Sequence, residues 1–173
     1  MDFQILGQNS LKLKSKKVTL AVDPEAKISK FEADAVLLTD KTADLSRVNN
    51  YRIVINGPGE YEVAGLKMSG IKSDGGYIYE LINENGNVLI ARAGAVNKIP
   101  QDRLNNYKII VLNADSELNQ TAITAMEPSV VVLYGSLKTE GARKLGSSVT
   151  SESSKISISE EKLPEELEVV LLG

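Results

Sequence analysis

The sequence predicts a single α+β domain in which layers of helix cover packed β-sheets. Short apolar or alternating segments recur about every ten residues through residue 91, which is typical of consecutive strands. From residue 100 onward, helix-like and strand-like segments alternate, which favours helices on the faces of sheets. The 173 residues suffice for one continuous core, and no change in composition marks a linker, so we expect one domain over residues 1–173.

The first half of the chain is expected to fold as a series of antiparallel strands. The predicted strands span residues 2–6, 10–14, 18–22, 34–39, 51–56, 66–71, 77–82 and 88–91, with a further strand after Gly59. Turns are expected at residues 15–17, at Gly57-Pro58-Gly59 and at Asn85-Gly86, the strongest short hairpin signal in the chain. In the second of these turns, glycine permits a positive φ at Gly59. Residues 45–48 are expected to form one helical turn.

The second half is expected to alternate between helices and strands. The predicted helices span residues 100–107, 119–126 and 139–145, and the predicted strands span residues 108–112, 129–134, 155–159 and 167–172. Pro100 suits a helix start, Asn119 an N-cap, and Gly146 the position after a helix. The Ser-rich segment 147–154 is expected to be a loop, and the last two strands are expected to pair with each other.

Composition excludes several classes of active site. The chain has no His and no Cys, which excludes a Ser-His-Asp triad, a Cys-His pair and a zinc site built from histidines or thiolates. The net charge is −3 and no basic block stands out, so nucleic acid is not an expected partner. No apolar run approaches ~18 residues and the N-terminus is not signal-like, so we expect no membrane partner and a cytoplasmic location.

A set of short motifs resembles one known family. The motifs are Gly7-Gln8, Val22-Asp23-Pro24, Thr39 to Leu45, Gly57 to Val63, Arg92 to Ala95, and Glu127-Pro128 followed by a strand and Gly135. In this order they resemble the metallo-β-lactamase superfamily, specifically its small bacterial branch of lactonase-like zinc-dependent hydrolases. The likeness covers nearly the whole chain, and its most specific piece is the segment from Gly57 to Val63. The resemblance implies a four-layer αββα sandwich.

The resemblance also implies where a zinc site would lie, and the chain departs from the family there. The family's ligand positions fall on Asp40, Thr42, Asp44, Leu45, Arg92, Ala95 and Gly135, and only Asp44 keeps the family's residue type. A further histidine expected near Ser73 is missing. Zinc needs several nitrogen or sulfur donors at about 2.0–2.3 Å, and it supplies the activated water for hydrolysis. We therefore expect no zinc, no other cofactor and no catalytic residue.

We interpret the remaining positions as a vestigial pocket. It would be formed by Gln8, Asp23, Asp40, Thr42, Asp44, Arg92 and Gly135. Arg92 is expected either to enter the pocket and pair with one or both of Asp40 and Asp44, or to point into solvent. The two aspartates could bind a hard cation with help from Asp23 and Thr42, but a helix cap or an ion pair is the favoured interpretation.

Two classes of function remain. The leading interpretation is a non-catalytic protein of this fold, a pseudoenzyme that has lost the zinc site and has a binding or scaffolding role. Its partner would be an unidentified small ligand or protein, and homo-oligomerisation is left open. The alternative is a hydrolase that acts without zinc or with a hard cation, through Asp40, Asp44 or Glu60. Glu60 and Glu62 could form an acid–base pair, but solvated side chains on one strand face are favoured.

Overall fold

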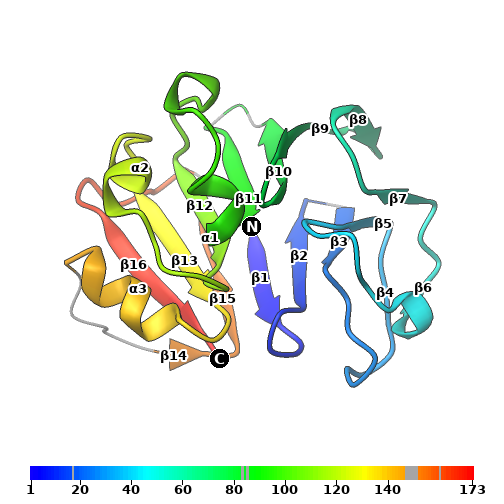
Figure 1. The fold of residues 1–173 in the computed structure, drawn as a ribbon. Coiled ribbons are helices and arrows are strands. Elements are labelled where there is room, and N and C mark those ends of the chain that lie inside the picture. Colours follow the sequence, from blue (N-terminus) through cyan, green and yellow to red (C-terminus); the bar gives the residue numbers. More distant parts are fainter. Residues whose placement is uncertain (17, 83, 85, 147–151, 160) are drawn as a thin grey trace.

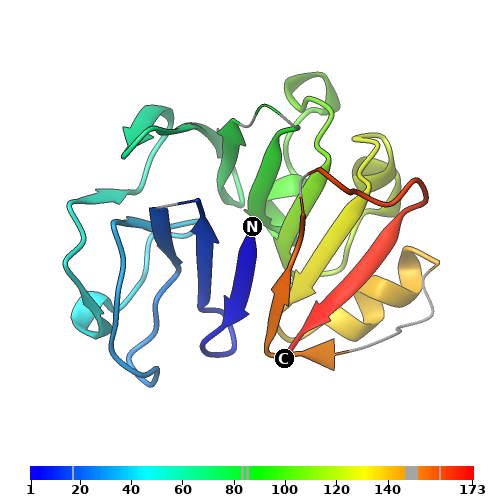
Figure 2. The ribbon, with the colours of Figure 1, turned by 180° about the vertical axis from the view of Figure 1, so that it is seen from behind.

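The structure, a computed structural model, describes residues 1–16, 18–82, 84, 86–146, 152–159 and 161–173. Figure 1 shows two twisted β-sheets that pack against each other, with the helices α1, α2 and α3 gathered on one side of the molecule. The N-terminal strand β1 runs between the two halves in the views of both Figure 1 and Figure 2. The predicted α+β class and sandwich architecture are confirmed.

The six-stranded sheet has the strand order β15-β1-β2-β3-β5-β7. Its strands are β15 (Lys155–Ser157), β1 (Asp2–Ile5), β2 (Leu11–Ser15), β3 (Val18–Val22), β5 (Ala35–Leu37) and β7 (Ile53–Ile55). The strands β1, β2 and β3 are antiparallel, as predicted, but β3, β5 and β7 are parallel. The expectation of a wholly antiparallel first half is therefore wrong. The connection from Val22 to Ala35 is long enough for the crossover that a parallel pair requires.

The eight-stranded sheet has the order β14-β16-β13-β12-β11-β10-β9-β8. Its strands are β14 (Glu152–Ser153), β16 (Glu168–Leu172), β13 (Val130–Tyr134), β12 (Ile109–Asn113), β11 (Val88–Arg92), β10 (Gly76–Ile82), β9 (Leu66–Ser73) and β8 (Gly59–Val63). From β8 to β11 the strands are antiparallel, and β11, β12, β13 and β16 are parallel. Every residue of β12 and β13 is buried, as expected for apolar strands covered on both faces.

Apolar clusters hold these layers together. Between the sheets, Phe3 and Leu20 share a buried cluster with Met68 and Val111. On the outer face of the eight-stranded sheet lie the helices α1 (Ala93–Val96), α2 (Gln120–Thr124) and α3 (Lys138–Lys144), and a second cluster joins them to the sheet. Asn119 caps α2 and Gly146 follows α3 with a φ of +75°, as predicted.

The outer layer of the six-stranded sheet consists of short elements. The 3₁₀ turn Leu45–Arg47 lies there with a two-stranded sheet of β4 (Phe31–Glu32) and β6 (Val48–Asn49). Leu45 and Phe31 pack against a small buried cluster that includes Val36 of β5. This layer completes the αββα arrangement.

Two predicted elements are wrong. Residues 100–107 contain only the 3₁₀ turn Gln101–Arg103, because the side chains of Asn105 and Tyr107 bond to Glu80 of β10 and tie the segment to the sheet. The strands β15 and β16 do not pair with each other: β15 joins β1, and β16 joins β13 in the other sheet. Both edges of β16 are already paired, with β13 and β14, so β15 pairs instead with β1 at the end of the six-stranded sheet.

Some predicted turns fall on undescribed positions. Lys17, Asn85 and residues 147–151 lie outside the described residues, so the turns and the loop predicted there are not tested. The end of that predicted loop is described, and it contains β14. In the described parts of the chain, no helix has the length and apolar character needed to cross a membrane.

Candidate functional site

Strand ends from both sheets meet at one edge of the sandwich. In the six-stranded sheet, β3 is followed by Asp23, and its parallel neighbour β5 leads to Thr39. In the eight-stranded sheet, Arg92, Asn113 and Tyr134 end β11, β12 and β13 and stand in register. Because side chains alternate along a strand, these three continue the rows of apolar residues that face the other sheet. The carboxyl ends of parallel strands are common places for sites, so this edge is the candidate site.

Arg92 lies at the centre of this edge and bridges the two sheets. Its Nε donates to Thr39 Oγ1 at 3.2 Å and lies 3.6 Å from Asp23 Oδ2. Its Nη1 lies 3.3 Å from Asp40 Oδ2 and 3.7 Å from Asp115 Oδ2. The Arg92 side chain is only 18% exposed, so three carboxylates surround a largely buried guanidinium. The expected pair with Asp40 is confirmed, and the alternative of an arginine in solvent is wrong.

Asp44, the other expected partner of Arg92, has a different role. Its side chain accepts a hydrogen bond from Ser46 N at 2.8 Å and caps the 3₁₀ turn Leu45–Arg47. Hydrogen bonding to Ser46 lowers the pKa of Asp44. No ion pair joins Asp44 to Arg92 within the described residues. The capping interpretation of Asp44 is therefore confirmed, and its expected pair with Arg92 is wrong.

Asp23 is the buried carboxylate of the site. Its side chain is 3% exposed and accepts hydrogen bonds from Thr39 N at 2.7 Å and from the Thr39 hydroxyl. Its φ is +43°, a left-handed conformation that aspartate adopts more readily than most residues. Burial raises the pKa of Asp23, and the hydrogen bonds from Thr39 and the charge of Arg92 offset this only in part.

Asn113 takes the space beside Gly135. Gly135 follows β13 with a φ of +92°, and a Cβ atom added there would overlap Asn113 Oδ1. Asn113 is fully buried, and its Nδ2 donates to Asn9 Oδ1 at 3.2 Å. The resemblance places the family's last histidine at position 135, but this packing leaves no room for a side chain unless Asn113 moves. Next to Gly135, Tyr134 is fully buried, and burial raises its pKa.

The predicted pocket residues are divided among three cavities. Asp23, Thr42, Asp44 and Arg92 line a cavity of about 370 Å³. Gln8 and Gly135 line a second cavity of about 360 Å³, and Asp40 lines a third of about 410 Å³. The structure thus brings four of the seven residues to one cavity, and Arg92 links Asp40 to them. Their role as a vestigial pocket stays a prediction.

Sequence reasoning missed two polar residues of this edge. Asn113 and Asp115 follow the apolar strand predicted at 108–112, just as Asp40 follows the strand predicted at 34–39. This position after a buried strand is the signal that could have found them. The Asp115 carboxylate also accepts a hydrogen bond from Gly94 N at 3.2 Å, which fixes the start of α1 beside Arg92. Glu60, the third candidate acid, is exposed on β8, as a solvated side chain would be.

The donors present do not fit zinc. The chain has no His or Cys, and among the described residues no group of three His, Cys, Asp or Glu side chains could hold a metal ion. Three aspartates do converge, but the Arg92 guanidinium lies in ion-pair range of each of them. A cation at this point would have to displace a positive charge that is already paired. Neither the ligand types nor the space therefore suit a zinc centre.

Comparison with known proteins gives likeness in structure only. No protein-family model and no curated protein matches the chain. A putative zinc-dependent hydrolase of the metallo-β-lactamase superfamily from Thermotoga maritima superposes with a TM-score of 0.76 at 17% identity, over 99% of this chain and 98% of that one. A metallo hydrolase from Ignicoccus hospitalis gives a TM-score of 0.61 at 14% identity, over 84% and 90% of the two chains.

A further neighbour supports the same architecture. The metallo-β-lactamase fold protein YhfI from Bacillus subtilis gives a TM-score of 0.58 at 9% identity, over 99% of this chain and 96% of that one. At such low identities the likeness extends to the fold alone. The neighbours with this architecture include hydrolases. The chain therefore has the metallo-β-lactamase fold.

Proposed function

We propose that this protein is a non-catalytic member of its fold, with a binding or scaffolding role in place of zinc-dependent hydrolysis. The observation that carries the proposal is the position of Arg92. Its guanidinium lies within 3.3 to 3.7 Å of Asp23, Asp40 and Asp115, at the edge where the strand ends of both sheets meet. A fixed side-chain cation thus balances the acidic groups of the edge.

Two further features support the proposal. Asn113 occupies the space that a side chain at position 135 would need, so a metal ligand there would require repacking. Asp44, the one ligand position that keeps the family's residue type, caps a 3₁₀ turn and makes no ion pair with Arg92 within the described residues. The edge is therefore packed as a structural ion-pair network, and no pair of carboxylates is left as an evident acid and base.

Metal content tests the proposal. The protein is purified without chelator, and one portion is incubated with excess zinc and then desalted, before both are analysed by mass spectrometry for metals. We expect far less than one zinc per chain in both samples, because nitrogen and sulfur donors are missing. The Arg92→Ala variant, which opens space but adds no donor, is expected to stay equally free of zinc. About one or two equivalents of zinc in the wild-type protein would overturn the proposal.

Turnover tests the alternative function. Esters, lactones and phosphodiesters are offered with and without Mg²⁺, Ca²⁺ or Mn²⁺, and the variants Asp40→Ala, Asp44→Ala and Glu60→Ala serve as controls. We expect no turnover above that of buffer. Turnover that is lost in one of these variants would replace the proposal with a hydrolase that works without zinc. Turnover that needs an added divalent cation would replace it with a hard-cation hydrolase.

A further inference from the structure

A separate concave site lies at the opposite end of the strands from Arg92. It is a cavity of about 520 Å³, lined by Ser15, Lys16, Val18, Ala64, Gly65, Leu66, Lys67, Ile82 and Glu84. Val18 begins β3, whereas Asp23 follows the end of that strand, so roughly 15 Å of strand separates the two sites. A volume of this size falls in the range of small-molecule pockets, roughly 300–1,000 Å³.

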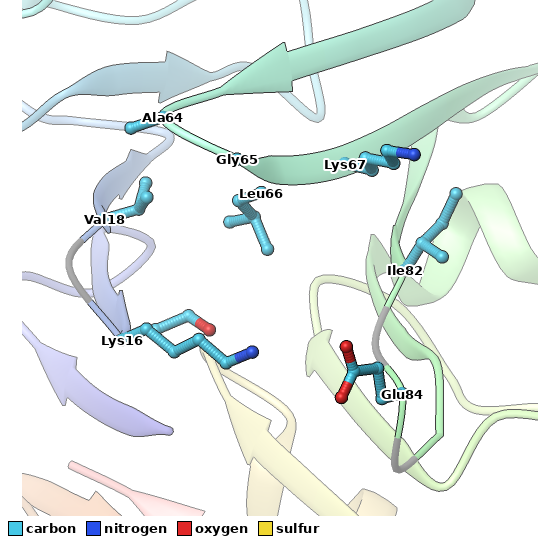
Figure 3. Close-up of a pocket in the computed structure, with 9 residues that line it drawn as sticks. Lys16, Val18, Ala64, Gly65, Leu66, Lys67, Ile82 and Glu84 are labelled. Atoms are coloured by element: carbon cyan, nitrogen blue, oxygen red, sulfur yellow. The ribbon is translucent and has the colours of Figure 1, made fainter.

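The inner surface of this cavity is apolar. Val18 and Leu66 are 2% and 9% exposed, and both belong to the buried cluster between the two sheets. Figure 3 shows Leu66 extending into the space between Val18 and Ile82. Ile82 is 48% exposed, which is the largest value among the exposed large hydrophobic residues of the described chain. A molecule with an apolar part could therefore cover exposed aliphatic surface here and reach the core between the sheets.

The rim of the cavity carries charge. Lys16 and Lys67 supply two cations and Glu84 one anion, so the rim has a net charge of +1. Within the described residues neither lysine makes an ion pair. Lys67 stands opposite the acidic Glu62 of β8 in the strand register, whereas Lys16 follows the end of β2 and has no cross-strand partner among the described residues. Figure 3 shows the Lys16 side chain below Val18 and Leu66, with its ammonium extending toward the side of the cavity where Glu84 lies.

We propose that this cavity binds a small amphipathic carboxylate. The aliphatic or aromatic part lies against Val18, Leu66 and Ile82, and the carboxylate pairs with Lys16. The occupant is a free small molecule, because the cavity is concave and of ligand size. The positive rim over an apolar floor favours an acid over a neutral apolar molecule of the same length. This site goes beyond the function proposed above and does not rest on it, since no residue is shared with the Arg92 edge.

Octanoate is the probe for the test, and 1-octanol is its neutral counterpart of equal chain length. Binding is followed by amide chemical shifts of the full-length protein during titration. We expect one saturable site for octanoate with a Kd below about 1 mM. The shifts should fall at residues 64–67 and 82, while residues 40 and 92 at the other edge stay unchanged. Octanol should bind more weakly.

Two pairs of variants separate the apolar contact from the charge. Ile82→Ser should raise the Kd for octanoate at least about fivefold, whereas Ile53→Ser, a change at another exposed isoleucine (39% exposed), should leave it unchanged. Lys16→Asn should raise the Kd about threefold for octanoate alone, with Lys30→Asn as the control. Asparagine suits the φ of +52° at Lys16, so this variant should keep the fold.

Four outcomes would overturn the proposal. They are absence of saturation at millimolar octanoate, shifts centred on Arg92, equal effects of the two isoleucine variants, and equal affinity for octanoate and octanol. None of them bears on metal content or turnover, so this proposal and the proposed function can fail independently.

Discussion

Arg92 Nε lies 3.6 Å from Asp23 Oδ2, and this contact joins the last residue of β11 to the residue that follows β3 in the other sheet. The two side chains belong to different layers, so the pair spans the interior edge of the sandwich. Both groups are largely removed from water, with exposures of 18% and 3%. A cation and an acid at such a position stabilise the edge only while both are present, because either one alone would be a poorly solvated polar group.

Removal of Arg92 should therefore destabilise the protein. Arg92→Met keeps much of the side-chain volume but leaves Asp23, Asp40 and Asp115 without their shared cation. We expect the free energy of unfolding to fall by about 2–4 kcal/mol, measured by urea denaturation at neutral pH. Arg52→Met, at an exposed arginine, is the control and should change it by no more than about 0.5 kcal/mol. Equal effects would mean that Arg92 contributes no more than a surface residue.

Double-mutant cycles should show which aspartate is coupled to Arg92. Arg92→Met combined with Asp40→Asn should cost less than the sum of the two single changes, by about 0.2–1 kcal/mol, because Asp40 is 43% exposed and the pair is partly screened. Arg92→Met combined with Asp44→Asn should be additive within about 0.5 kcal/mol, because Asp44 bonds to Ser46 instead. Coupling to Asp44 but not to Asp40 would contradict the geometry of the site.

Strands could be predicted because their signal is local. The apolar run at 129–134 and the alternating segment at 10–14 match the observed strands within about one residue. A strand buried on both faces gives a continuous run of apolar residues, and one buried on a single face gives an alternation of apolar and polar residues. Strand partners could not be predicted in the same way. Ile156 of β15 faces Phe3 of β1, and that choice depends on which strand edge is free once the sheets have formed.

The candidate site was predictable only in part. The resemblance places Asp40 and Arg92 at ligand positions, so their pair is one of the two alternatives that the sequence predicts, and the structure contains it. For Asp44 the sequence leaves a helix cap and a pair with Arg92 both open. The structure contains the cap of the 3₁₀ turn, because such local bonds compete well with distant partners. Asp115 comes to Arg92 through the parallel pairing of β11 with β12, which no local pattern contains.

The turn at Gly57-Pro58-Gly59 offers a matched pair of glycines. Gly59 has a φ of +141°, a region closed to most side chains, whereas Gly57 has no positive φ and a Cβ there would meet only Tyr61 Oη, at 3.9 Å. Gly59→Ala should lower the free energy of unfolding by about 1–3 kcal/mol through backbone strain. Gly57→Ala should leave it almost unchanged. Similar melting temperatures for the two variants would show that the conformation of Gly59 is not needed.

The pH dependence of the free energy of unfolding should show that burial raises the pKa of Asp23. Burial raises the pKa of this carboxyl in the folded protein above the value of about 3.9 that it has in the unfolded chain. Between these two pKa values the folded state binds more protons than the unfolded state, so stability falls as pH rises through this window. The Asp23→Asn variant has no titrating group at this position, so it serves as the reference for the effect of the carboxyl. The difference in free energy of unfolding, wild type minus Asp23→Asn, should therefore decrease from the unfolded pKa up to the folded pKa and be level on either side of this window.

Asp44 provides the control of opposite sign for this measurement. Its pKa is lowered by the hydrogen bonds to Ser46, so its contribution is present above the unfolded value and is lost as pH falls through the folded value. Urea denaturation between about pH 3 and pH 8 should then give a difference that falls with pH for Asp23→Asn and one that rises with pH for Asp44→Asn. A rising difference for both variants would mean that Arg92 and Thr39 outweigh burial and that Asp23 is ionised more readily in the folded protein than in the unfolded chain.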